Sequence, residues 1–169
     1  EAYNIPLIVS GPGIGPGTGP DAGAGEESNA LVSIVDLGPT LLELAGAEPI
    51  DVPDSRSFAS ALRDPAGCSA DFDSCCAEFY GTRFLVTQRI LWQGDWKFVF
   101  NGFDFDELYN LGEDPHELAN LAGKPEHRER MRTMMAEIWR TAHATGDQAI
   151  LGTHYAPMRI APVGPNTGK

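Results

Sequence analysis

The chain has 169 residues, of which 42% are hydrophobic, so it is long and apolar enough for one packed domain or for parts of two. Its formal net charge of −12 opposes binding to nucleic acid or to an anionic membrane, because phosphate groups would be repelled. No apolar stretch approaches the roughly 20 residues that a membrane-spanning helix needs. These properties predict a soluble protein with an acidic surface.

An apolar run at residues 5–9 is typical of a buried strand. Because this run follows almost directly on Glu1, we expect further sequence upstream, and the cellular compartment is not indicated. Residues 11–25 are rich in glycine and proline and are predicted to form a loop. The loop does not fit a dinucleotide-binding motif, because Thr18 stands where the third glycine would be required.

Apolar residues at helical spacing after Asp36 predict a helix that ends at Gly46. Ser33 and Asp36 spell a capping box, but a start at Ser33 would place Pro39 inside the helix. We therefore interpret Asp36 as the helix cap, a structural role. A short helix is expected over residues 58–63, and the turn at residues 64–67 is the predicted boundary between two parts of the chain.

The three cysteines, Cys68, Cys75 and Cys76, do not have the paired spacing of a zinc site. A disulfide between Cys68 and one of the adjacent pair and three free thiols both remain open. The cysteines therefore do not indicate a redox compartment.

Residues 78–91 predict one or two strands, and residues 95–100 and 105–111 predict two more, which together indicate an antiparallel meander. Trp96, Phe98 and Phe100 alternate onto one face of their strand, with Lys97 and Val99 on the other. Trp96 is the predicted core anchor. The dipeptide Asn101-Gly102 breaks this strand.

Asp114, Pro115 and Glu117 together spell a helix start with a capping box, which predicts a short helix over residues 115–121. A long helix is expected from Pro125 to about residue 145, ended by Gly146 and lying across one face of the sheet. Its apolar stripe is predicted to fill the core, and it contains Met131, Met134, Met135, Ile138 and Ala142. Residues 149–169 are predicted to be an irregular tail, and a homo-oligomer formed through this tail remains open.

No constellation in the chain can form a catalytic or metal site. An EF-hand reading of Asp104, Asp106 and Asn110 fails because Tyr109 occupies the position of the obligatory glycine. The four histidines are far apart in sequence, and neither a nucleophile elbow nor a paired-histidine zinc motif is present. His154 is the single residue that we place near a substrate, because it lies in the tail.

The strand that contains Trp96 and Lys97, the segments FDFDELYNL and EDPHELANLA, and the long helix after them resemble the C-terminal region of type I sulfatases of the alkaline phosphatase superfamily. Residues 5–13 and 32–48 resemble a late strand and helix of the same family. The resemblance implies an α/β fragment plus an α+β unit. Residues 1–65 would end the catalytic domain, residues 66–148 would form a small subdomain with an antiparallel sheet of three to four strands, and residues 149–169 would be the tail.

The resemblance also implies hydrolysis of a sulfate monoester with formylglycine and calcium as cofactors. The Cys/Ser-x-Pro-x-Arg motif of that family is absent here, so the chain is predicted to hold no catalytic residue and no metal ligand, and to be inactive alone. Its implied partners are the upstream catalytic portion of the same protein and a sulfate ester. Two alternatives are a non-catalytic structural module or remnant, and a related phosphodiesterase or phosphonate hydrolase.

Overall fold

A computed structural model describes residues 5–12, 14–15, 25–65, 67, 69–81, 87–101 and 105–152. The chain forms two compact units, Glu1–Asp73 and Ser74–Lys169. The first unit extends beyond the turn at residues 64–67 where the sequence placed the boundary. The physical reason is Phe72, which is buried in the core of this unit with Phe58 and Ala61.

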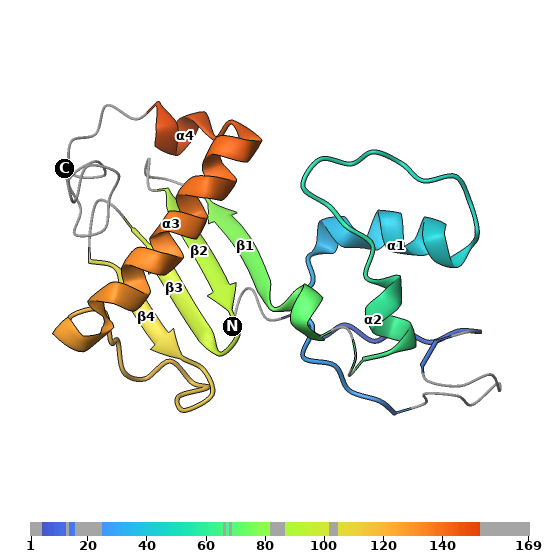
Figure 1. Cartoon of the computed structure of the whole chain (residues 1–169), viewed down its shortest axis with the longest axis horizontal. Coiled ribbons are helices and arrows are strands. Elements are labelled where there is room, and N and C mark those ends of the chain that lie inside the picture. The colour runs from blue at the N-terminus through green and yellow to red at the C-terminus, as the bar shows by residue number, and fades with distance from the viewer. Residues whose placement is uncertain are drawn as a thin grey trace. The chain divides into compact units, whose positions relative to one another are not determined.

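The described residues of the first unit form the α-helices α1 (Leu37–Leu44) and α2 (Ala59–Arg63), which pack against each other (Figure 1). Short 3-10 turns precede them at Ile34–Asp36 and follow them at Ser69–Phe72. Both predicted helices are confirmed. Gly46 follows α1 with a φ of 65°, a conformation that glycine adopts without strain, which explains why the helix ends there.

The prediction of a buried strand at residues 5–9 is wrong for this structure. These residues have no strand conformation, and the side chains of Ile5 and Ile8 are 71% and 92% exposed. A strand in a parallel sheet is buried by neighbouring strands and by helices on both faces. Within the described part of the chain, no strand pairs with this segment.

The second unit is built on a four-stranded antiparallel sheet with strands in the order β1-β2-β3-β4. The strands are β1 (Ser74–Phe79), β2 (Gln88–Gln93), β3 (Trp96–Phe100) and β4 (Glu107–Asn110). Each strand pairs with the next one in sequence, as in Phe98 opposite Leu91 and Leu108. The predicted antiparallel meander is therefore confirmed.

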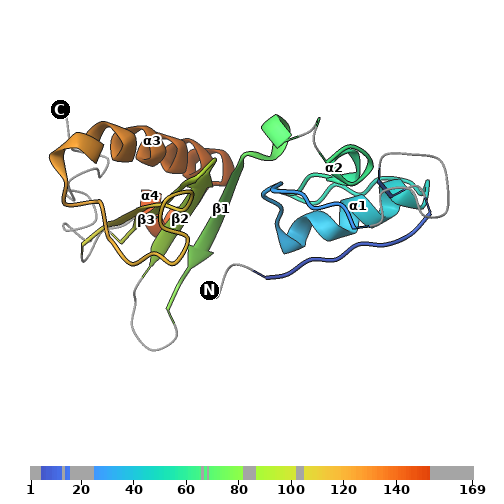
Figure 2. The same cartoon turned by 90° about the horizontal axis from the view of Figure 1, so that it is seen from below.

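The long helix α3 (Arg128–Thr145) crosses one face of this sheet (Figures 1 and 2). Its methionine stripe is buried, as predicted, and packs against the inward side chains of the strands. Gly146 ends the helix with a φ of 68°. The core combines residues of α3 with strand residues: Met131, Met134, Met135, Ile138 and Ala142 with Leu91, Phe98, Phe100 and Leu108.

The beginning of the predicted irregular tail is ordered as a short helix, α4 (Gln148–Leu151). Asp147 caps it, because its carboxylate accepts a hydrogen bond from the Ala149 amide at 3.0 Å. Ile150 is buried against the sheet–helix core. The irregular tail predicted from residue 149 is therefore wrong for these first residues, and residues 153–169 lie outside the described part of the chain.

Trp96 is not the core anchor that its strand pattern suggested. Phe98 and Phe100 are fully buried, whereas Trp96 is half-buried at the margin of the core. Its ring centroid lies 5.5 Å from that of His127, and the Arg130 guanidinium lies 5.1 Å from its ring. Trp96 is the first residue of β3, so it meets the start of α3 rather than the helix centre.

Among the described residues, two that are not glycine have a left-handed backbone, Asp54 with a φ of 60° and Glu117 with a φ of 56°. This conformation is strained for a residue with a Cβ atom. Asp54 is exposed, so Asp54→Gly should raise the free energy of unfolding by about 0.5–1 kcal/mol. Urea titration of the two proteins measures this gain.

Glu117→Gly is the matched comparison. It relieves the same strain, but it removes the carboxylate that pairs with Lys97, which is only 8% exposed. We expect this variant to lose about 1–3 kcal/mol in the same titration. A gain of stability at both positions would show that the ion pair of Glu117 contributes less than its backbone strain costs.

Candidate functional site

The described residues do not contain a group of three or more His, Cys, Asp or Glu side chains that could hold a metal ion. Cys76 lies on β1 and points toward Thr141 of α3, with 4.0 Å between Sγ and Oγ1. Burial raises the pKa of its thiol, which disfavours the reactive thiolate. Cys68 and His154 lie outside the described residues, so the disulfide and the substrate role of His154 stay predictions.

Asp36 is 5% exposed and ties the start of α1 to a distant loop. Its carboxylate accepts hydrogen bonds from the backbone amides of Ser33 at 2.8 Å and Arg56 at 2.9 Å. The Thr40 hydroxyl donates to the Asp36 carbonyl at 2.6 Å and accepts from the Phe58 amide at 3.0 Å. Asp36 does precede α1, but its side chain does not cap that helix, so the predicted capping contact is wrong.

This arrangement fixes a loop that borders an open hollow of about 530 Å³. Arg56 projects from the loop, and its guanidinium donates to the Asp71 carbonyl at 2.6 Å and lies 4.4 Å from the Phe72 ring. Glu43 also lines the hollow, and hydrogen bonds from Ser57 and Arg63 lower the pKa of its carboxyl. A carboxylate held ionised in this way is a weak base, so Glu43 is poorly suited to general-base catalysis.

The segment after β4 is a hydrogen-bonded turn rather than the predicted helix at residues 115–121. Asp114 accepts a hydrogen bond from the Ala119 amide at 2.9 Å, and the neighbouring backbone amides, that of Leu118 foremost, lower the pKa of its carboxyl. Glu117 has a left-handed backbone and turns its side chain to Lys97 instead of closing a capping box. The ion pair between Glu117 and Lys97 of β3 therefore replaces the predicted capping box within the turn.

Asn120 holds this turn to β4. Its side-chain oxygen accepts from the amides of Leu108 at 3.1 Å and Ala122 at 2.9 Å, and its side-chain nitrogen donates to the Asp106 carbonyl at 3.0 Å. The Leu121 amide also donates to the Leu108 carbonyl at 2.8 Å. The sequence reasoning missed Asn120, although an asparagine beside a turn is a known signal for backbone hydrogen bonds.

Lys97 is a cation on the face of the sheet opposite α3. Its ammonium lies 2.6 Å from the Glu117 carboxylate and within 6 Å of the rings of Trp92 (5.6 Å) and Tyr109 (5.9 Å). Burial and a hydrogen bond to Glu107 raise the pKa of Tyr109 to about 12, so this phenol stays neutral. The ion pair between Lys97 and Glu117 therefore anchors the turn to the sheet.

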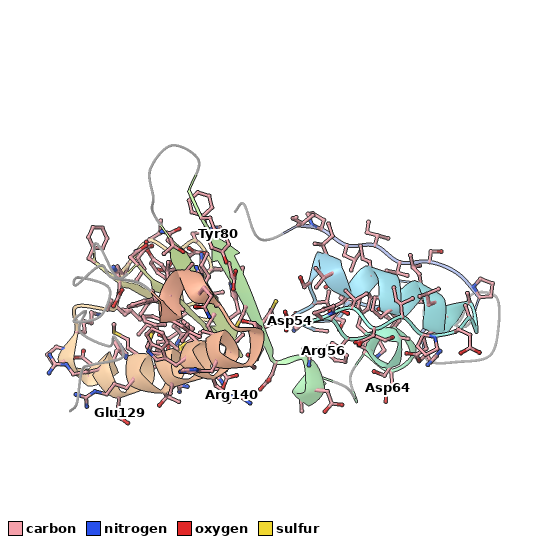
Figure 3. All side chains as sticks on the ribbon, turned by 90° about the horizontal axis from the view of Figure 1, so that it is seen from above. Asp54, Arg56, Asp64, Tyr80, Glu129 and Arg140 are labelled. Atoms are coloured by element: carbon pink, nitrogen blue, oxygen red, sulfur yellow. The ribbon has the colours of Figure 1, made fainter. Side chains whose placement is uncertain are left out.

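Arg89 and Asp147 form a second buried pair, 2.6 Å apart, between β2 and the end of α3. Both side chains are about 5% exposed or less. Arg89 also lies 4.9 Å from the ring of Tyr80, which is at the end of β1 (Figure 3). A hydrogen bond to Glu78 raises the pKa of Tyr80 to about 12. The adjoining cavity of about 20 Å³ holds at most one water, too little for a substrate.

The comparisons with known proteins identify the scaffold. Residues 1–144 match the family model described as "N-sulphoglucosamine sulphohydrolase, C-terminal". The chain belongs to this family of sulfatase C-terminal regions. Together with the four-stranded sheet and the long helix, the match confirms the predicted fold class, a C-terminal sulfatase subdomain. Within the described ranges, no helix has the length and apolar character to cross a membrane.

The similarity extends to individual proteins. The chain is 32% identical to arylsulfatase K of Xenopus laevis over 149 residues, which cover 80% of this chain and 26% of that protein. BT4656, solved in complex with its substrate D-glucosamine-2-N,6-O-disulfate, superposes with a TM-score of 0.66 at 24% identity, over 85% of this chain and 29% of its own. A phosphonate monoester hydrolase of Agrobacterium radiobacter superposes with a TM-score of 0.52 at 22% identity, over 68% of this chain and 25% of its own. The chain thus spans between a quarter and a third of each relative.

Proposed function

We propose that this chain is the C-terminal part of an enzyme that hydrolyses sulfate monoesters, with the nucleophile and the metal site supplied by the upstream portion of the same protein. The match of residues 1–144 to a sulfatase C-terminal family carries this proposal. The relatives' names support a sulfate ester as the substrate class.

The chemistry of this reaction explains why the catalytic groups would lie in the upstream portion of the protein and not in this chain. Cleavage of a sulfate ester needs a nucleophile aimed at sulfur, cations that stabilise the anionic oxygens and an acid for the leaving group. In sulfatases the resemblance implies formylglycine and calcium for the first two roles. The described residues of this chain do not fit either group, because they contain no candidate metal cluster and the charges of Arg89 and Lys97 are already paired with Asp147 and Glu117.

The contribution of this chain is therefore structural in our proposal. The second unit presents a rigid sheet held by α3, by the turn with Asn120 and by the Arg89–Asp147 pair. Rigid elements outside the reacting groups fix the geometry of a catalytic site. Such a unit would shape the entrance to the substrate site of the complete protein.

The test is an assay of the full-length protein, produced together with a formylglycine-generating enzyme. We expect release of inorganic sulfate from aryl or sugar sulfates, with a higher kcat/KM than for a phosphonate monoester. A protein in which the upstream nucleophile is replaced by alanine is the control. The reverse preference would support the phosphonate hydrolase alternative, for which a TM-score of 0.52 is weaker support. Turnover of neither substrate would support a non-catalytic module.

A further inference from the structure

The chain passes from its first unit to its second between Asp73 and Ser74, and Ser74 is also the first residue of β1. The 3-10 turn Ser69–Phe72, which we call the junction turn, comes directly before this point (Figure 1). Asp73 alone separates the junction turn from the strand. One residue spans at most about 3.6 Å of chain, so the position of the junction turn determines where β1 can begin.

The junction turn is held to the first unit by Phe72 and by Arg56. Phe72 is buried in the core of the unit, and its carbonyl accepts a hydrogen bond from the Leu31 amide at 2.8 Å. The Arg56 guanidinium donates to the Asp71 carbonyl at 2.6 Å and lies 4.4 Å from the centre of the Phe72 ring (Figure 3). Arg56 therefore contacts both the backbone and a side chain of the junction turn.

The loop that carries Arg56 is fixed in turn by the start of α1. The Arg56 amide donates to the Asp36 carboxylate at 2.9 Å, and the Phe58 amide donates to the Thr40 hydroxyl at 3.0 Å. Asp36 and Thr40 are both buried, so a shift of the loop would leave buried polar groups without partners. Arg56 thus links a rigid part of the first unit to the junction turn.

An arginine suits this position because its guanidinium group is planar. Such a group can lie over an aromatic ring and still donate to a carbonyl oxygen, whereas a lysine ammonium is a compact charge at the end of a flexible chain. Arg56 is exposed, so its removal opens no cavity in the core. Loss of this side chain should therefore loosen the junction turn and leave the core of the unit intact.

We propose that Arg56 is a positioning residue, which fixes the start of the second unit and thereby the substrate entrance of the complete protein. The proposal rests on the proposed function, in which the second unit shapes that entrance. Arg56 acts through the junction turn rather than on the reacting groups. A displacement of about 1 Å, even one caused far from the chemistry, can lower catalytic efficiency strongly.

Hydrogen exchange of the full-length protein tests the structural step. Arg56→Ala should speed amide exchange about tenfold at Leu31 and in residues 69–76, because it removes a charge-assisted hydrogen bond and a ring contact. Arg63→Ala is the matched control, since it removes another exposed arginine of the same unit, paired with Glu43 at 2.8 Å. We expect no change at these amides in the control. Unchanged exchange in Arg56→Ala, or equal acceleration in Arg63→Ala, would overturn the proposal.

The kinetic step uses the smallest and the largest of the aryl and sugar sulfates that the full-length protein hydrolyses. In Arg56→Ala, kcat/KM for the largest ester should fall about tenfold through KM, and that for the smallest should change less than about twofold, because a small ester depends less on the entrance. Arg63→Ala should change neither value.

Equal losses for both esters in Arg56→Ala would indicate general damage to the fold and overturn the positioning role. Faster exchange with unchanged kinetics for both esters would overturn it as well, because the junction turn would then not be coupled to the entrance. Faster exchange in a protein that hydrolyses no sulfate ester would refute the proposed function and leave the contact of Arg56 with the junction turn standing.

Discussion

Phe98→Ala should lower the free energy of unfolding by about 3–5 kcal/mol, because it leaves a cavity at the centre of the sheet–helix core. The Phe98 side chain is 0% exposed and lies in one cluster with Leu91, Leu108 and Met134. Urea titration followed by circular dichroism measures the loss. Trp96→Ala is the control, since this ring is only half-buried, and we expect it to cost less than half as much. Equal losses would place Trp96 in the core after all.

Arg89→Met is expected to cost about 3–5 kcal/mol, because it leaves the buried carboxylate of Asp147 without its cation. The Asp147 side chain is 4% exposed, so water cannot replace the arginine. Urea titration again gives the loss for the single variant.

The double variant Arg89→Met with Asp147→Asn also removes the unpaired negative charge of the Asp147 carboxylate, and it keeps a side-chain oxygen that can cap α4. It should recover part of the lost stability, which a double-mutant cycle reports as a coupling energy of more than about 1 kcal/mol. Strictly additive losses would mean that the two side chains act independently, despite the 2.6 Å between them.

The elements that the sequence predicted well are those in which a local repeat and one buried face agree. The methionine stripe of α3 has helical spacing and a glycine stop, and both features hold in the structure. The strands alternate with a period of two, so the faces of Phe98 and Lys97 could be assigned. The alternation could not show that Trp96 lies at the margin of the core, because the burial of a residue along the strand depends on where α3 crosses the sheet.

The errors arose where a distant partner decides the local structure. The spacing of Asp114 and Glu117 favours a capping box. In the structure, the Glu117 carboxylate instead forms an ion pair with the Lys97 ammonium at 2.6 Å. Residues 5–9 have the composition of a buried strand, but no strand pairs with them in the described part of this chain, and only the end of the run, at Val9, packs against the core of the first unit.

The candidate site shows the same limit. The lack of a nucleophile motif could be deduced from sequence, because that motif is local. The pairing of Arg89 with Asp147 could not, because it joins residues 58 positions apart. Asn120 was overlooked for a related reason, since its side chain hydrogen-bonds to the backbone of β4 and no charge pattern marks it.

The hydrogen bonds of Asn120 have a consequence for self-association. β4 is an edge strand of the sheet, and an open edge strand is a template on which a second chain can add a strand through backbone hydrogen bonds. Asn120 and Leu121 already occupy the amide and the carbonyl of Leu108, as an added strand would. Aggregation through this edge strand would first have to displace the turn from Leu108. Loss of the Asn120 side-chain amide would therefore expose the edge strand to pairing with another chain.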